Sequence, residues 1–131
     1  KLEHIGIAVK DIQSANKIFA DVFGEEHYKM EVVESEGVST SFFQVGESKV
    51  ELLEATNENS AIAKFIEKRG EGIHHLAFEC KDIDAELERL KGLGYRLIHE
   101  TPKDGADNKR IAFLHPKSTN GVLVELCQEK S

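Results

Sequence analysis

The sequence predicts an α+β fold built from two βαβββ modules. A histidine, alternating apolar residues and Lys-Asp-Ile occupy residues 4–12, and the same pattern recurs 71 positions later over residues 75–83. Apolar residues at helical spacing follow each copy. A self-match at a fixed offset indicates two copies of one supersecondary unit. We expect the two modules to pair into a curved mixed β-sheet whose inner face forms a cleft.

Composition limits what such a fold can do. With 131 residues, 40% of them hydrophobic, the chain is long enough for one domain with a real core. We expect a first module over residues 1–54, a helical connector over 55–72 and a second module over 73–131. The net charge of −7 argues against a nucleic-acid surface and is typical of a cytoplasmic protein. Apolar runs are short, so neither a membrane span nor a membrane partner is predicted.

Alternation and helical spacing define the elements of the first module. Asp11 can cap a helix whose apolar residues recur from Ile12 to Phe23, and Gly24 ends it. Around this helix we expect strands over residues 4–9, 28–33, 38–45 and 49–53. The connector opens at Ser60 with a short helix that runs to Arg69.

The second module repeats this order. We expect a strand over residues 73–80, a helix over 84–91, and further strands over 95–99, 110–114 and 122–128. A polar loop is predicted over residues 101–108 and a turn over 115–120. Cys80 and Cys127 form no CxxC motif, so they are expected to be reduced, buried thiols.

Four residues at matching places in the repeat predict a metal site. The last strand of each module carries a glutamate between apolar neighbours, Glu51 and Glu125, and each first strand carries His4 or His75. A single glutamate of this kind is often only the solvated side of a strand, but two matched His–Glu pairs are much harder to explain by chance. Two imidazoles and two carboxylates neutralise a divalent cation, and their mixed N/O character suits Zn, Co, Ni, Mn or Fe(II). On an octahedral ion, two positions would stay open for substrate oxygens.

The other histidines are weaker candidates. His74 directly precedes His75, so strand alternation points it to the opposite face, where we expect a packing role or a contact behind the ligands. His115 lies in the His-Pro-Lys-Ser turn and is interpreted as an ordinary turn residue, although contact with a substrate stays open. For His27 and His99 the sequence indicates no partner.

These residues resemble the vicinal oxygen chelate (glyoxalase/bleomycin resistance/dioxygenase) superfamily, whose fold is paired βαβββ modules. Within it, the chain is most similar to the methylmalonyl-CoA epimerase family. The similarity spans nearly the whole chain, and its most specific part is the His-Pro-Lys-Ser turn followed by Gly-Val-Leu-Val-Glu-Leu. Matching stretches lie over residues 4–9, 72–79, 102–103, 109–118 and 121–126.

The resemblance implies a metal-dependent epimerase of methylmalonyl-CoA. It implies a divalent ion (Co, Ni, Mn or Zn) held by His4, Glu51, His75 and Glu125, which would stabilise the enolate as charge develops on oxygen. Of these residues, Glu125 is expected to be one catalytic acid/base and Glu51 the weaker candidate for the other. The acyl-CoA substrate is polyanionic, so basic residues of the second module are expected to bind its phosphates: Lys103, Lys109, Arg110 and Lys117. A homodimer is expected because such sheets commonly leave an apolar face to cover.

Two departures from the family pattern concern the chemistry. Some epimerases have glutamine at the position of Glu51. Some also carry a catalytic glutamate three residues after the glycine matched by Gly37, where this sequence has Thr40. The identity of the second acid/base is therefore open.

Three other functions fit the same fold. Lactoylglutathione lyase (glyoxalase I) uses a His/Glu/His/Glu metal set, but its usual Phe-Tyr pair in the first helix and its Asp-Pro-Asp-Gly turn are absent here. Non-catalytic modules that sequester bleomycin-like drugs generally lose the four ligands, which this chain keeps. An extradiol dioxygenase is disfavoured because it needs iron, a longer chain and only three protein ligands.

Overall fold

The chain folds into two compact units, each built around one of the predicted modules. The structure is a computed structural model that describes all residues from 1 to 131. One unit comprises residues 4–74, and the other comprises residues 1–3 together with 75–131. Of its three α-helices, none combines the length and apolar character needed to cross a membrane.

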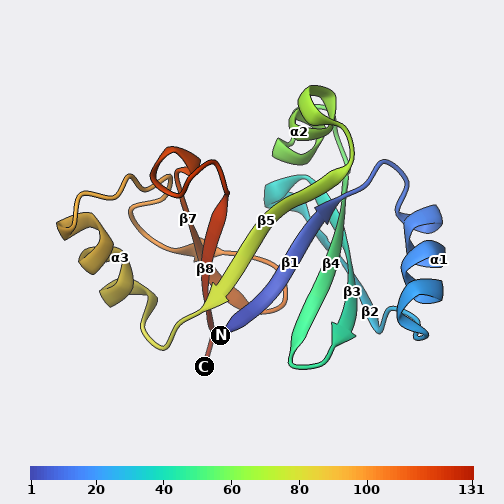
Figure 1. The fold of residues 1–131 in the computed structure, drawn as a ribbon, viewed down its shortest axis with the longest axis horizontal. Helices are drawn as coiled ribbons and strands as arrows, with labels where there is room; N and C mark the ends of the chain where they lie inside the picture. The colour runs from blue at the N-terminus through green and yellow to red at the C-terminus, as the bar shows by residue number, and fades with distance from the viewer. The chain divides into compact units, whose positions relative to one another are not determined.

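The first module is a four-stranded mixed sheet against which helix α1 packs (Figure 1). Its strands follow the hydrogen-bonded order β2-β3-β4-β1, in which β1 and β4 are parallel and the other neighbours antiparallel. The elements are β1 (Leu2–Ala8), α1 (Ile12–Phe23), β2 (Lys29–Val33), the 3-10 turn η1 (Glu34–Glu36), β3 (Val38–Val45) and β4 (Ser48–Ala55). The expected βαβββ order is therefore confirmed for this half.

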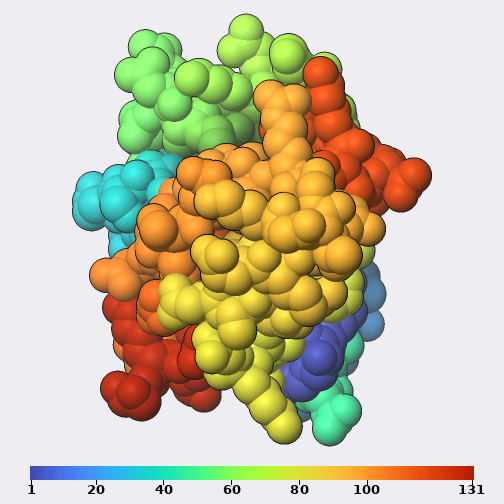
Figure 2. Space-filling view, turned by 90° about the vertical axis from the view of Figure 1, so that its left-hand side faces the viewer, coloured from blue at the N-terminus to red at the C-terminus, as the bar shows by residue number.

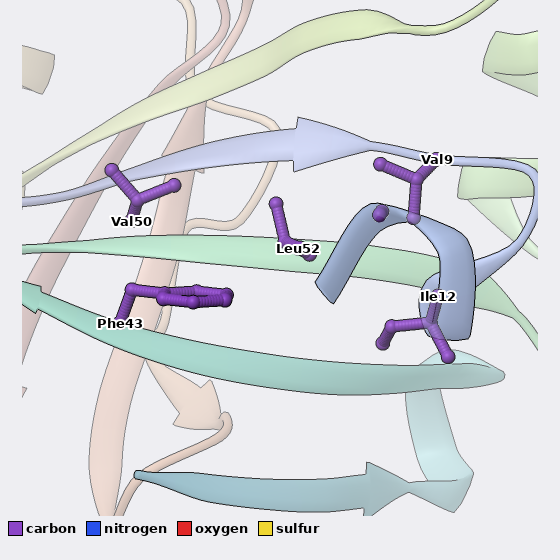
Figure 3. Close-up of a cluster of buried hydrophobic side chains, with 6 residues drawn as sticks. Val9, Ile12, Phe43, Val50 and Leu52 are labelled. Atoms are coloured by element: carbon purple, nitrogen blue, oxygen red, sulfur yellow. The ribbon is translucent and has the colours of Figure 1, made fainter. Parts of the chain in front are cut away.

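Helix α1 is fixed at both ends by the residues that the sequence indicated. The Asp11 carboxylate accepts a hydrogen bond from the backbone N–H of Gln13, 3.1 Å away, and so caps the first turn. Gly24 ends the helix with a left-handed φ of 74°, a conformation that costs glycine little. Buried apolar side chains join α1 to β3 and β4 (Figure 3): Val9, Ile12, Ala15, Phe43, Val50 and Leu52.

The predicted connector belongs to the first unit. Helix α2 (Ala61–Arg69) begins at Ser60, whose hydroxyl accepts a hydrogen bond from the Ala63 N–H. Its apolar face, with Ile62 as the buried residue, packs against Ala8, Val38 and Leu53. The connector helix thus closes a second hydrophobic cluster of the first module.

The second module has strand order β5-β8-β7-β6, again with its first and last strands parallel. Helix α3 begins after Asp82, whose side chain caps it, and Ile83 and Leu87 are buried under it. Figure 2 shows the side chains of α3 and of the segment after it gathered on one outer face of this unit. The elements are β5 (Gly72–Glu79), α3 (Ile83–Gly92), β6 (Lys103–Asp104), β7 (Lys109–Leu114), the 3-10 turn η2 (Pro116–Ser118) and β8 (Val124–Glu129).

The repeat is preserved down to the strand register. In the first module Gly6 lies opposite Glu51, and in the second Ala77 lies opposite Glu125. His4 lies two residues before Gly6, and His75 lies two residues before Ala77. Because residues two apart on a strand project to the same face, each histidine shares a face with the residue that pairs with the glutamate. Duplication of sequence therefore corresponds to duplication of geometry within each module.

The strand expected over residues 95–99 is wrong. Only an isolated bridge between Leu97 and Leu114 forms there, and the second module takes its second strand from the two-residue β6. The reason is that the His99 imidazole Nδ1, 3.2 Å away, accepts a hydrogen bond from the backbone N–H of Phe113. In a continuous β-ladder the Phe113 N–H would donate to a backbone carbonyl of the neighbouring strand. Here it donates to the His99 side chain instead. The apolar alternation reflects packing of Leu97 on the core under α3.

Candidate metal and acid–base site

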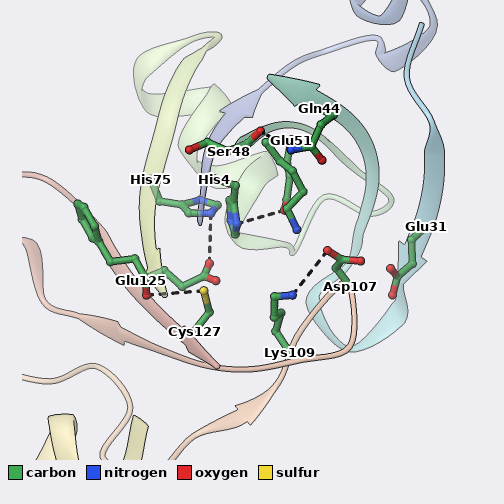
Figure 4. A network of polar contacts seen from close by, with 12 residues as sticks. His4, Glu31, Gln44, Ser48, Glu51, His75, Asp107, Lys109, Glu125 and Cys127 are labelled. Atoms are coloured by element: carbon green, nitrogen blue, oxygen red, sulfur yellow. Dashed lines mark hydrogen bonds and ion pairs between the residues drawn. The ribbon is translucent and has the colours of Figure 1, made fainter. Parts of the chain in front are cut away.

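The first module brings together a buried histidine and a buried glutamate. His4 on β1 and Glu51 on β4 are 5% and 4% exposed, and His4 Nδ1 lies 3.1 Å from Glu51 Oε2 (Figure 4). The parallel pairing of β1 with β4 sets this contact. Because burial removes water from both groups, each needs a partner, and the pair supplies one.

The second module contains the matching pair. His75 on β5 and Glu125 on β8 are 5% and 4% exposed, and His75 Nε2 lies 3.2 Å from Glu125 Oε1 (Figure 4). The edge of the Phe113 ring packs against the His75 imidazole, with the ring centroids 5.6 Å apart. This aromatic contact limits how the imidazole can rotate.

Both pairs fit the chemistry of a divalent metal site. All four residues, together with the buried Glu3 that precedes His4, belong to groups of side chains able to ligate a metal ion. Ligand atoms at about 2.1 Å from one ion and at right angles to each other are separated by about 3 Å. The separations of 3.1 Å and 3.2 Å within the pairs agree with this spacing. The donor set excludes neither zinc nor the other N/O-binding divalent ions.

A buried lysine beside Glu51 is a residue that the sequence reasoning missed. Lys49 is 6% exposed, and its Nζ lies 3.9 Å from Glu51 Oε2. The ring of Phe42 lies beneath two ammonium groups, 5.8 Å from Lys49 Nζ and 4.5 Å from Lys29 Nζ. The spacing of two residues from Glu51 on one strand was the signal that could have identified Lys49.

Thr40, which stands where some members of the resembled family carry a catalytic glutamate, lies on the same face of β3 as Phe42. It is fully buried, and its hydroxyl Oγ1 has no hydrogen-bond partner. Across the β2–β3 pairing, Thr40 lies opposite Glu31. An unpartnered buried hydroxyl is costly, so this position calls for a specific explanation.

The remaining histidines have structural partners or packing contacts. The ring of His74 packs edge-on against Phe65 at a centroid distance of 4.9 Å, which agrees with the predicted packing role. In η2 the Nδ1 atom of His115 accepts a hydrogen bond from the Lys117 backbone N–H. The pKa of His115 is lowered by partial desolvation and by the charges of Arg96 and Lys117. These contacts are those of an ordinary turn histidine.

Three of the four predicted phosphate-binding residues lie on opposite faces of β6 and β7, and the fourth, Lys117, is exposed in the turn η2. Lys103 and Lys109 lie on the face of β6 and β7 that also carries Ile111, which is opposite Cys127 of β8. Arg110 points the other way, and its guanidinium forms a two-pronged contact of 3.1 Å and 3.3 Å with Asp84 of α3. Lys109 is 7% exposed and lies 3.9 Å from a carboxylate oxygen of Asp107 and of Glu129.

Both cysteines are free thiols in the second module, and their exposure differs. Cys127 is buried, whereas Cys80 is only half-buried, so the expectation of two buried thiols is wrong for Cys80. Burial raises the pKa of both thiols above its ordinary value, and for Cys127 the negative charges of Glu125 and Glu3 add to the effect. Neither thiol is therefore activated as a nucleophile.

Comparison with known proteins gives one consistent picture. Residues 3–113 match the model of the Glyoxalase/Bleomycin resistance protein/Dioxygenase superfamily. An ethylmalonyl-CoA/methylmalonyl-CoA epimerase from Cereibacter sphaeroides is 41% identical over 130 residues, which cover 98% of this chain and 97% of the relative.

Solved structures agree with the sequence matches. The methylmalonyl-CoA epimerase of Mycobacterium tuberculosis superposes with a TM-score of 0.94 at 38% identity, covering 99% of this chain and 88% of that one. A methylmalonyl-CoA epimerase in complex with methylmalonyl-CoA and NH4+ superposes with a TM-score of 0.95 at 36% identity, covering 100% and 95% of the two chains. The predicted fold class is confirmed by these likenesses.

Proposed function

The chain belongs to the methylmalonyl-CoA epimerase family of the glyoxalase/bleomycin resistance protein/dioxygenase superfamily, and from this premise we propose that it interconverts the 2R and 2S epimers of methylmalonyl-CoA. Its family makes it an isomerase. The observation that carries the proposal is the buried His–Glu contact that recurs in each module. These contacts occur in a chain that aligns over 98% of its length with an ethylmalonyl-CoA/methylmalonyl-CoA epimerase.

The proposal includes one divalent ion, Co, Ni, Mn or Zn, held by His4, Glu51, His75 and Glu125. When bound, such an ion offsets the negative charge that develops on the thioester oxygen as the C2 proton leaves. The four side chains themselves supply two negative charges and two neutral nitrogens, which suits a doubly charged cation. Their burial keeps water away from the donors and strengthens the electrostatic interaction with the cation.

Epimerisation also requires proton transfer at C2 on both faces of the carbon. We assign one transfer to Glu125: its carboxylate takes the proton from C2 and becomes a carboxylic acid, while the electron pair moves toward the thioester oxygen. A second acid must then return a proton to the opposite face. A positioned proton-transfer group typically contributes about 10²–10⁴-fold to the rate.

Glu51, the weaker sequence candidate for the second transfer, is poorly suited to it. Like Glu125, the residue is 4% exposed and has an imidazole beside its carboxylate, but Glu51 also has a buried ammonium group next to it, that of Lys49 at 3.9 Å. These contacts favour the ionised carboxylate and restrict its movement, as a fixed ligand requires.

The polyanionic acyl-CoA needs basic groups in a protein of net charge −7. We propose that Lys103 and Lys109, on the inner side of β6 and β7, and Lys117 of η2 contribute positive charge toward the substrate. Arg110 is the weakest member of the predicted set, because it lies on the other face of β7 and Asp84 engages its guanidinium. Lys109 is on the inner face, but Asp107 and Glu129 partly offset its charge. The homodimer stays a prediction.

Deuterium exchange tests the proposed function. The metal-loaded protein is incubated with (2S)- or (2R)-methylmalonyl-CoA in D₂O, and deuterium entry at C2 and inversion are followed. We expect both with at least one of Co, Ni, Mn or Zn. Absence of exchange with all four metals, together with turnover of the methylglyoxal–glutathione hemithioacetal, would identify a glyoxalase I instead. As a control, Glu125→Ala should lose both metal retention and exchange.

A further inference from the structure

We propose that Glu31 is the second proton-transfer group of this site and that the Thr40 hydroxyl positions the substrate beside it. The assignment rests on the proposed epimerase function and deepens it. It places the second acid/base on an edge strand of the first module, away from the predicted metal ligands.

Strand register places Glu31 on the face that carries Glu51. Directly opposed residues of antiparallel strands project to the same face of a sheet, as do residues two apart on one strand. Glu31 lies opposite Thr40, Phe42 is two residues after Thr40, and Phe42 lies opposite Glu51. Figure 4 draws Glu31 in the same view as His4 and Glu51, with its carboxylate apart from the contact between those two residues.

A second contact supports this orientation. Lys29, two residues before Glu31, lies opposite Phe42, and its ammonium is 4.5 Å from the centre of the Phe42 ring. The same ammonium is 3.9 Å from Glu31 Oε1. The Lys29 and Glu31 side chains therefore lie on this face together.

The buried hydroxyl of Thr40 points to a ligand next to Glu31. Its Oγ1 is inaccessible to solvent and has no hydrogen-bond partner in the protein. Burying a hydroxyl without a partner costs about 1–3 kcal/mol. A substrate oxygen on this face would accept the missing hydrogen bond and would lie next to the carboxylate opposite Thr40.

The environment of Glu31 suits a group that exchanges protons. Its side chain is 36% exposed, whereas that of Glu51 is 5% exposed. The carboxyl group of Glu31 can therefore exchange a proton with solvent between turnovers. Such exchange is needed because, at the start of each turnover, one of Glu31 and Glu125 must be protonated and the other ionised. In one direction Glu31 removes the C2 proton while the carboxylic acid of Glu125 protonates the other face. In the reverse direction Glu125 removes the proton and the carboxylic acid of Glu31 protonates the face on its own side.

Isotope exchange with Glu31→Gln tests the assignment. A two-base epimerase that lacks one base cannot invert its substrate, but the remaining base can still remove and return a proton on its own face. We expect inversion to fall about 10²–10⁴-fold, while one epimer keeps its C2 exchange in D₂O and the other loses it. The metal content, measured by atomic emission, should stay unchanged. Glu34→Gln, in the exposed turn η1, is the matched control and should keep wild-type inversion.

The remaining outcomes separate this inference from the proposed function. Wild-type inversion by Glu31→Gln would overturn the assignment while the epimerase function stands. So would one-sided exchange produced by Glu3→Gln, because Glu3 is a buried carboxylate immediately before His4. Equal loss of exchange from both epimers together with loss of metal would show that Glu31 has a structural role only. Absence of exchange in the wild type would instead contradict the epimerase proposal.

Discussion

The carboxylate of Glu51 is held between an imidazole and an ammonium group. His4 lies 3.1 Å and Lys49 3.9 Å from the same oxygen, and all three side chains are at least nine-tenths buried. An ammonium group next to a carboxylate favours its ionised form, which is what a metal ligand requires. The charge of Glu51, and not only its oxygen, should therefore matter for the affinity of the site.

Glu51→Gln separates these two contributions. The amide keeps one oxygen donor and removes the charge, so the dissociation constant for Co²⁺ should rise by at least the roughly 10–100-fold that loss of an outer contact costs a metal site. Equilibrium dialysis measures the change. Glu47→Gln, in an exposed turn, should bind Co²⁺ like the wild type. Unchanged affinity in Glu51→Gln would show that the charge of Glu51 does not contribute to the affinity of the site.

The cap of α1 should make stability depend on pH. Hydrogen bonds from the Ser14 hydroxyl and the Gln13 N–H lower the pKa of Asp11 below its ordinary value of 3.8. An acid whose pKa is lowered by folding stabilises the folded state above its ordinary pKa, and this contribution is lost as the pH falls through the lowered value.

We therefore expect Asp11→Ala to be less stable than the wild type at pH 7, with a smaller difference below pH 3.8. Urea unfolding at several pH values measures the free energies. Glu25→Ala, at an exposed position after the helix, serves as the control. A difference that grows on acidification would contradict the assignment.

At the scale of elements, one side chain ties the start of each helix to the last strand of its module. The backbone N–H of Ile12 donates to Glu54 Oε2 at 3.0 Å, and that of Ile83 donates to Gln128 Oε1 at 2.9 Å. Both acceptors lie three residues after the glutamate of their pair, Glu51 or Glu125. The free N–H groups at the helix starts are thus satisfied by the strands that carry the predicted ligands.

Removal of this tie should destabilise the module locally. Gln128→Ala leaves the Ile83 N–H without its acceptor, so the free energy of unfolding should fall by about 0.5–1.5 kcal/mol. Urea denaturation measures the loss. Gln128→Glu keeps an acceptor oxygen and should retain most of the stability. If both variants were equally destabilised, side-chain packing rather than the hydrogen bond would be responsible.

Most elements follow from local patterns, and the two errors are neighbours: no strand forms over residues 95–99, and the loop predicted over 101–108 contains β6. Strand β3 spans residues 38–45 as alternation predicts, and α1 begins and ends at the predicted cap and glycine. Residues 95–99 alternate equally well, but the His99 side chain takes the Phe113 N–H that a ladder needs. Alternation reports which side chains are buried and does not report which backbone groups pair.

At the scale of the whole molecule, the internal duplication predicts more of the candidate site than any single motif does. Comparison of the two halves identifies the contacts of His4 with Glu51 and of His75 with Glu125 before any coordinates are known. Glu31 and Thr40 escape the same reasoning because their proximity depends on the β2–β3 register, which the sequence does not state. Lys49 escapes it because the second module has no lysine at the matching position, where Leu123 stands.

A metal held by ligands from both modules would couple the stability of one to the integrity of the other. Cys127 reports on the second module, because burial shields its thiol and raises its pKa, so alkylation requires that module to open. A ligand at 100 times its dissociation constant stabilises the folded state by about 2.7 kcal/mol, or roughly 100-fold in the open population. Metal should therefore slow iodoacetamide labelling of Cys127 by about that factor.

His4→Ala tests whether the ion is shared. The substitution lies in the first module, yet it should remove most of the metal-dependent protection of Cys127, because a site that loses a ligand binds the ion more weakly. Mass spectrometry measures labelling of Cys127, and the half-buried Cys80 gives an internal comparison in the same sample. His27→Ala, which removes a first-module histidine outside the quartet, should leave the protection in place. If His4→Ala kept full protection, the ion would be bound by His75 and Glu125 without help from the first module.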